Sequence, residues 1–84
     1  MNRLQTLEEI ELYLKEKLSV LLNVDVDKIP SDANLVEELG ADSIVIVQLF
    51  VNIQDDFGID MNQELNLGQA ITVEMIAKYI KENM

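Results

Sequence analysis

The chain has 84 residues, 49% of them hydrophobic, and its sixteen acidic and six basic residues give a formal net charge of −10. It contains no cysteine and no histidine, which excludes disulfides, thiolate metal sites and Ser–His or Cys–His catalysis by its own side chains. The negative charge disfavours binding to nucleic acid and favours partners with basic surfaces. We expect residues 1–84 to form one monomeric domain.

The first predicted element is a helix that begins after Thr6 and runs to about Leu22. Thr6 and Glu9 have the spacing of a capping box, in which each side chain accepts a hydrogen bond from the other residue's backbone N–H. The residues of its predicted buried face recur at helical spacing: Leu7, Ile10, Leu14, Leu18 and Leu21. The N-terminus has no signal-like apolar core and no apolar stretch is long enough to span a bilayer, so we expect a cytoplasmic protein without membrane insertion.

Residues 23–41 are predicted to form a long ordered loop, because Asn23, Pro30 and Gly40 interrupt any regular pattern. Its expected anchors to the core are apolar: Val24, Val26, Ile29, Leu35 and Leu39. Loops of this length in compact domains usually carry function or short helical turns.

Asp25 and Asp27 resemble the beginning of a calcium-binding loop. The EF-hand pattern then requires an oxygen ligand and a glycine, where this chain has Ile29 and Pro30. We therefore predict a solvated loop and no metal site.

The next predicted element is a helix from Ser43 to Phe57. Its β-branched start, Ile44 to Val47, favours a strand by propensity. Gly58 is well placed to end a helix, and the apolar residues fall at helical spacing: Ile46, Leu49, Phe50, Ile53 and Phe57.

The C-terminal part is predicted to hold a short helix within residues 60–67 and a last helix after Thr72. Thr72 is a suitable N-cap, and the following apolar residues form one helical face: Val73, Ile76, Ala77 and Ile80. The sequence thus predicts an all-α fold, a small bundle of three main helices and one short helix with a long loop after the first.

The predicted helix from Ser43 to Phe57 has two candidate sites, one near its end and one at its beginning. Asp55 and Asp56, with Asp60 nearby, form an acidic cluster, but adjacent helical residues point in different directions. A solvated helix end is therefore the simpler interpretation. The other candidate is Leu39-Gly40-Ala41-Asp42-Ser43-Ile44, which reads as a glycine turn and a helix cap but also presents an accessible serine where a phosphate is favoured.

This motif resembles the attachment motif of the acyl carrier protein family, Leu-Gly-Ala-Asp-Ser-Leu. Val36-Glu37-Glu38 is similar to the family's acidic lead-in, Phe57 to the residue that closes its second main helix, and Thr72-Val73 with Tyr79-Ile80 to its last helix. The resemblance covers nearly the whole chain.

The resemblance implies a non-catalytic carrier, with 4′-phosphopantetheine from coenzyme A attached to Ser43 by a phosphopantetheinyl transferase. Asp42 would support the attachment. The arm would hold acyl intermediates as thioesters, passing them between acyl-transfer, condensing and tailoring enzymes of fatty acid, polyketide or related lipid biosynthesis. The implied docking residues are Ile44, Val45, Val47, Gln48, Val51 and Asp55, and the implied acyl-pocket residues are Ile46, Leu49, Phe50, Ile53, Phe57 and Ile76.

The chain departs from the family pattern at Val45, Gln48 and Gln54, where acidic residues are common. If the face of this helix that contains Ile46 and Leu49 is buried, the side chains left largely on the outer surface are Ile44, Val45, Val47 and Val51. This apolar face suggests a carrier for a dedicated pathway. Two alternatives remain: an aminoacyl, peptidyl or D-alanyl carrier, because Asp-Ser-Ile also occurs there, and an unmodified acidic interaction module in which Ser43 is only a cap.

Overall fold

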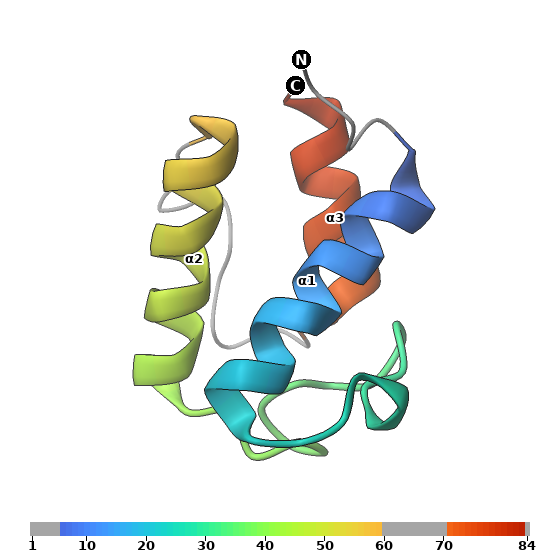
Figure 1. Cartoon of the computed structure of the whole chain (residues 1–84), viewed down its shortest axis with the longest axis vertical. Coiled ribbons are helices and arrows are strands. Elements are labelled where there is room, and N and C mark those ends of the chain that lie inside the picture. The colour runs from blue at the N-terminus through green and yellow to red at the C-terminus, as the bar shows by residue number, and fades with distance from the viewer. Residues whose placement is uncertain (1–5, 60–70, 84) are drawn as a thin grey trace.

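The computed structural model describes residues 6–59 and 71–83. Within them the chain forms α-helices and one short 3₁₀-helix and no strand: α1 Leu7–Leu22, η1 Val26–Lys28, α2 Ser43–Phe57 and α3 Val73–Glu82. In Figure 1, α2 and α3 both run opposite to α1, which contacts both and packs more extensively on α3. The predicted all-α bundle is confirmed, and the short helix predicted within 60–67 lies outside the described residues.

The helix ends follow the capping signals in the sequence. Glu9 N donates to Thr6 Oγ1 at 3.1 Å and Thr6 N to Glu9 Oε1 at 3.2 Å, which completes the capping box of α1. Gly58 ends α2 in the left-handed conformation at φ 71°. Thr72 Oγ1 accepts from Met75 N at 3.0 Å at the start of α3. These predicted boundaries are confirmed.

The core lies where the apolar faces of the helices meet. The side chains that form it are each at most 1% exposed: Ile10, Leu14 and Leu18 of α1, Ile46, Leu49 and Ile53 of α2, and Val73, Ile76, Ala77 and Ile80 of α3. Burial of each large aliphatic side chain stabilises the fold by roughly 1.5–3 kcal/mol. Leu7 was expected in this face but is 39% exposed, because it stands at the first position of α1, ahead of Ile10.

The segment between α1 and α2 crosses one end of the bundle and leads to the start of α2 (Figure 1). Its backbone is tied to the start of α3: Leu35 N donates to Ile71 O at 2.8 Å, and Glu74 N donates to Ser31 O at 2.9 Å. Ile29 and Leu35 are buried as predicted, Val24 and Leu39 pack against the core, and Val26 lies half-buried in η1. This anchoring ties the segment that leads to α2 to the start of α3.

Candidate functional site

The start of α2 is built by three consecutive residues with different tasks. Gly40 turns the chain at φ 74°, a conformation that L side chains rarely adopt, and Ala41 is buried in the core. Asp42 is the N-cap, and its Oδ1 accepts from Val45 N at 3.0 Å. In the alternative of an unmodified module Ser43 would serve as the cap, but Asp42 occupies that position and Ser43 is the first residue of the helix.

Ser43 is exposed at this helix start. The chain's other two serines are engaged: Ser19 Oγ donates to Val24 O at 2.5 Å, and Ser31 Oγ donates to Glu11 Oε1 at 2.7 Å. No hydrogen bond from the Ser43 hydroxyl is made within residues 6–59 and 71–83. Of the three serines, Ser43 is thus the one that faces solvent and whose hydroxyl donates no hydrogen bond to the described residues.

The backbone around Ser43 also suits an anion. The Asp42 side chain accepts a hydrogen bond from Val45 N. Ile46 N donates to the backbone oxygen of Asp42 at 3.1 Å, which is the first hydrogen bond of the helix. The N–H groups of Ser43 and Ile44 have no partner in the part of the chain that the structure describes. Free N–H groups at the positive end of a helix dipole favour a phosphate at this position.

The outer face of α2 carries an exposed apolar stripe made of Ile44, Val47 and Val51, which are 65%, 56% and 50% exposed. Gln48 and Asp55 are exposed beside it. Val45 was expected to lie outside with them, but it is half-buried and packs against the core. Its side chain lies one position before the buried Ile46 and turns partly inward, so the apolar surface is narrower than predicted.

The predicted acyl-pocket residues belong to the core. Ile46, Leu49, Ile53 and Ile76 are fully buried, and Phe50 and Phe57 are partly buried against them. A surface hollow of about 530 Å³ lies elsewhere, where α1 meets the following loop, and none of these residues lines it. An acyl chain between the helices would therefore have to displace packed side chains.

The acidic pair that resembles the start of a calcium-binding loop lies beside a short helix. Asp25 and Asp27 lie at the start of η1, a single 3₁₀ turn. Within the described ranges, no three acidic side chains are grouped closely enough to hold a metal ion. Nor does any helix in those ranges have both the length and the apolar character needed to cross a bilayer.

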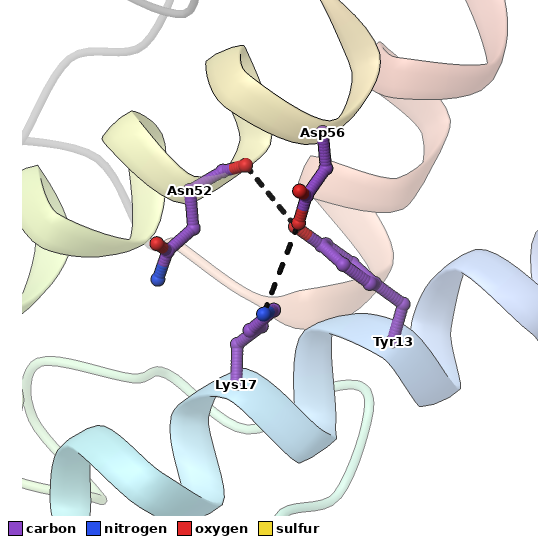
Figure 2. A network of polar contacts seen from close by, with 4 residues as sticks. All are labelled: Tyr13, Lys17, Asn52 and Asp56. Carbon is purple, nitrogen blue, oxygen red and sulfur yellow. Dashed lines mark hydrogen bonds and ion pairs between the residues drawn. The ribbon is translucent and has the colours of Figure 1, made fainter.

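The two adjacent carboxylates of α2 diverge, as predicted. Asp55 points to solvent, whereas Asp56 faces α1, where the Tyr13 hydroxyl donates to its Oδ2 and Lys17 Nζ lies 3.8 Å away (Figure 2). The Tyr13 hydroxyl also lies 3.2 Å from Asn52 O. The pKa of Tyr13 is raised well above its usual value, mainly because the hydroxyl is partly buried and secondly because it is hydrogen-bonded to Asp56.

This α1–α2 contact was not predicted from the sequence. A signal for it was present, because Tyr13 and Lys17 are four residues apart and so share a helical face, and the end of α2 is acidic. The contact lies at the end of α2 remote from Ser43, and the Tyr13 ring meets Phe57 edge-on at 5.1 Å between centroids.

Comparison with known proteins shows the family of the chain. Residues 12–80 match the family model described as "Phosphopantetheine attachment site". The chain is 32% identical over 76 residues to an acyl carrier protein of Helicobacter pylori strain G27, covering 90% of this chain and 91% of the relative. It is also 32% identical over 77 residues to an acyl carrier protein of Thermotoga maritima, covering 92% and 94%. The cofactor of the matched family is covalently attached 4′-phosphopantetheine, and the chain belongs to the acyl carrier protein family.

Proposed function

We propose that the protein carries acyl intermediates as thioesters on 4′-phosphopantetheine attached to Ser43. The observation that carries this proposal is the exposed hydroxyl of Ser43, which donates no hydrogen bond within the described part of the chain and lies inside the region matched by the attachment-site family. Ser19 and Ser31 already donate hydrogen bonds within the fold, so a transferase would have to break those bonds to use them.

The residues at the start of α2 would contribute to the attachment of the group as follows. Ser43 supplies the oxygen of the phosphodiester, and the free N–H groups at the helix start lie beside it. Asp42 keeps the helix start in place through Val45 N, and its exposed carboxylate is available to the transferase's magnesium ion. The cofactor supplies the thiol, which this cysteine-free chain lacks.

The proposed role is transport without catalysis. The partners are a phosphopantetheinyl transferase and the acyl-transfer, condensing and tailoring enzymes of fatty acid, polyketide or related lipid biosynthesis. They would dock on the exposed face of α2 around Ile44, Val47 and Val51, with Gln48 and Asp55 at its margin. The net charge of −10 favours basic docking surfaces on these enzymes. We further propose that the carrier acts as a monomer in the cytoplasm.

We also propose that this carrier serves a dedicated pathway. The support is the exposed apolar stripe of α2, where Val47 is 56% exposed and is followed by the uncharged Gln48. Such a surface favours enzymes whose docking site is partly apolar. A competition assay with fatty acid synthesis enzymes tests this idea: slower elongation than on a general carrier is expected, and equal rates would contradict it.

The carrier role is tested by intact-mass measurement after incubation with coenzyme A, magnesium and a broad-range phosphopantetheinyl transferase. We expect a gain of one phosphopantetheine in the native protein and in Ser31→Ala, and no gain in Ser43→Ala. If native protein gains nothing while a control carrier is loaded, the chain is an unmodified acidic binding module. If it loads but accepts aminoacyl rather than acyl groups, it is an aminoacyl carrier.

A further inference from the structure

The two ends of α2 are attached to the rest of the fold by different kinds of contact. At its Ser43 end, the inward side chains are apolar: Val45, Ile46 and Leu49 pack on the core. The polar cap there, from Asp42 to Val45 N, lies within the helix's own first turn and does not reach another helix. Just before the helix, Ala41 N donates to Leu35 O at 2.9 Å, which ties the loop to itself and not to another helix. The side chains at the Ser43 end of α2 are therefore held to the other helices by apolar packing.

At the other end of α2, polar and aromatic contacts reach across to α1. The Tyr13 hydroxyl contacts Asn52 O and Asp56 Oδ2, and Lys17 Nζ lies 3.8 Å from Asp56 Oδ2 (Figure 2). The Tyr13 ring meets Phe57 at an interplanar angle of 87°, and Lys17 Nζ lies 5.4 Å from the ring centroid. We call this set of interactions the Tyr13 contact.

These two kinds of contact respond differently to an inserted alkyl chain. Apolar packing is non-directional, so side chains that part from one another regain much of what they lose by packing on the methylenes of the insert. A hydrogen bond from a phenol to a carboxylate has no substitute in an alkyl chain. Separation of α2 from α1 is therefore easier at the Ser43 end than at the Tyr13 contact.

We propose that the Tyr13 contact fixes the far end of α2 to α1. Because of this contact, α2 separates from the other helices first at its Ser43 end. The contact thereby limits how far an acyl chain reaches between the helices. Ile46 and Leu49 line the part that opens first, and Phe57 lies at the closed end. Tyr13 is thus a specificity-determining residue for cargo length. This proposal rests on the carrier function proposed above, but its first test uses the unmodified protein and does not depend on that function.

The first test uses the unmodified protein and native-state hydrogen exchange of α2 amides. Tyr13→Phe keeps the ring and removes the hydroxyl, and Asp56→Asn weakens the acceptor. Each is expected to speed exchange at residues 53–57 by about threefold to tenfold, the effect of one ordinary hydrogen bond. Asp55→Asn is the matched control, because it removes the neighbouring charge without touching the contact. Equal acceleration along all of α2, or the same effect in Asp55→Asn, would overturn the proposal.

The second test loads Ser43 with saturated acyl groups of increasing length and measures the gain in Tm over the form with a free thiol. In the native protein the gain is expected to rise with length and then level off. In Tyr13→Phe it is expected to level off at a longer chain. The same levelling point in both proteins would overturn the length limit. If Ser43 accepts no phosphopantetheine, the length limit fails with the carrier function, while hydrogen exchange still decides whether the far end is held.

Discussion

The two ends of α2 have equally buried cores but opposite surroundings. At one end, Ile46 is 1% exposed while the preceding Ser43 and Ile44 face solvent. At the other end, Ile53 is fully buried and the following Asp56 is hydrogen-bonded to Tyr13 of α1. One helix thus combines an end that other proteins can reach with an end that is tied to its neighbour.

The difference between the ends is carried by a few side chains rather than by the core. The same apolar face runs through both, so hydrophobic burial does not distinguish them. The two ends differ in their hydrogen bonds. The Asp42 side chain accepts one within the first turn of α2, whereas the Tyr13 hydroxyl of α1 donates one to Asp56 of α2. The comparison can therefore be tested one side chain at a time.

The largest effects are expected from truncating the shared core. Ile46→Ala and Ile53→Ala should each lower the free energy of unfolding by about 2–5 kcal/mol, because each leaves a cavity in a fully buried site. Urea denaturation followed by circular dichroism measures both. A much smaller loss for Ile46→Ala would mean that the two ends already differ in the core, contrary to our comparison.

The next effect is expected at the Ser43 end. Asp42→Ala removes the side-chain acceptor of Val45 N and should lower the free energy of unfolding by about 1 kcal/mol. Ser43→Ala leaves this cap intact and should change stability far less. Asp32→Ala, at an exposed loop position, controls for the loss of one negative charge. A loss in Ser43→Ala as large as in Asp42→Ala would contradict the assignment of the cap.

A comparable or smaller effect is expected at the far end, and it should depend on pH. Tyr13→Phe should lower the free energy of unfolding by about 0.5–1 kcal/mol at neutral pH, since the hydroxyl is only partly buried. The pKa of Tyr13 is raised in the fold above its usual 10.0, so this stabilisation is complete below pH 10.0 and is lost as the pH rises further. Parallel unfolding curves at neutral and alkaline pH measure it. An advantage of the native protein that persists unchanged above that pH would contradict this account.

The smallest effect is expected from Lys17→Met. The ion pair with Asp56 at 3.8 Å joins side chains that are 40% and 44% exposed, so solvent screens it. We expect a loss of about 0.5 kcal/mol or less, which should disappear in high salt. Thermal melts at low and high salt measure this change. A loss larger than that of Tyr13→Phe would show that the ion pair, and not the hydroxyl, holds the far end.

Helix boundaries were predictable from the sequence because their signals are local. The Thr6–Glu9 capping box, Gly58 and the Thr72 cap all act within a few residues of the helix ends. The β-branched run at the start of α2 did not prevent a helix, because the periodic apolar face packs on the core only in that form. The motif from Leu39 to Ile44 is equally local, and attachment of phosphopantetheine to Ser43 stays a prediction.

Features that depend on how distant segments meet were not predictable. The hydrogen bond from Leu35 N to Ile71 O and the contact of Tyr13 with Asp56 both require the relative placement of helices. The inward position of Val45 likewise depends on how α2 is rotated against the core. Periodicity gives the centre of a buried face, but neighbouring side chains determine its edges.

The most direct test of the central claim is tandem mass spectrometry of the protein purified from cells that express it. Fragmentation of the peptide that contains Leu39 to Phe50 should place phosphopantetheine on Ser43. The peptides with Ser19 and Ser31 should be unmodified, because both hydroxyls are hydrogen-bonded within the fold. Phosphopantetheine on Ser19 or Ser31, or Ser43 unmodified in every molecule, would contradict the account.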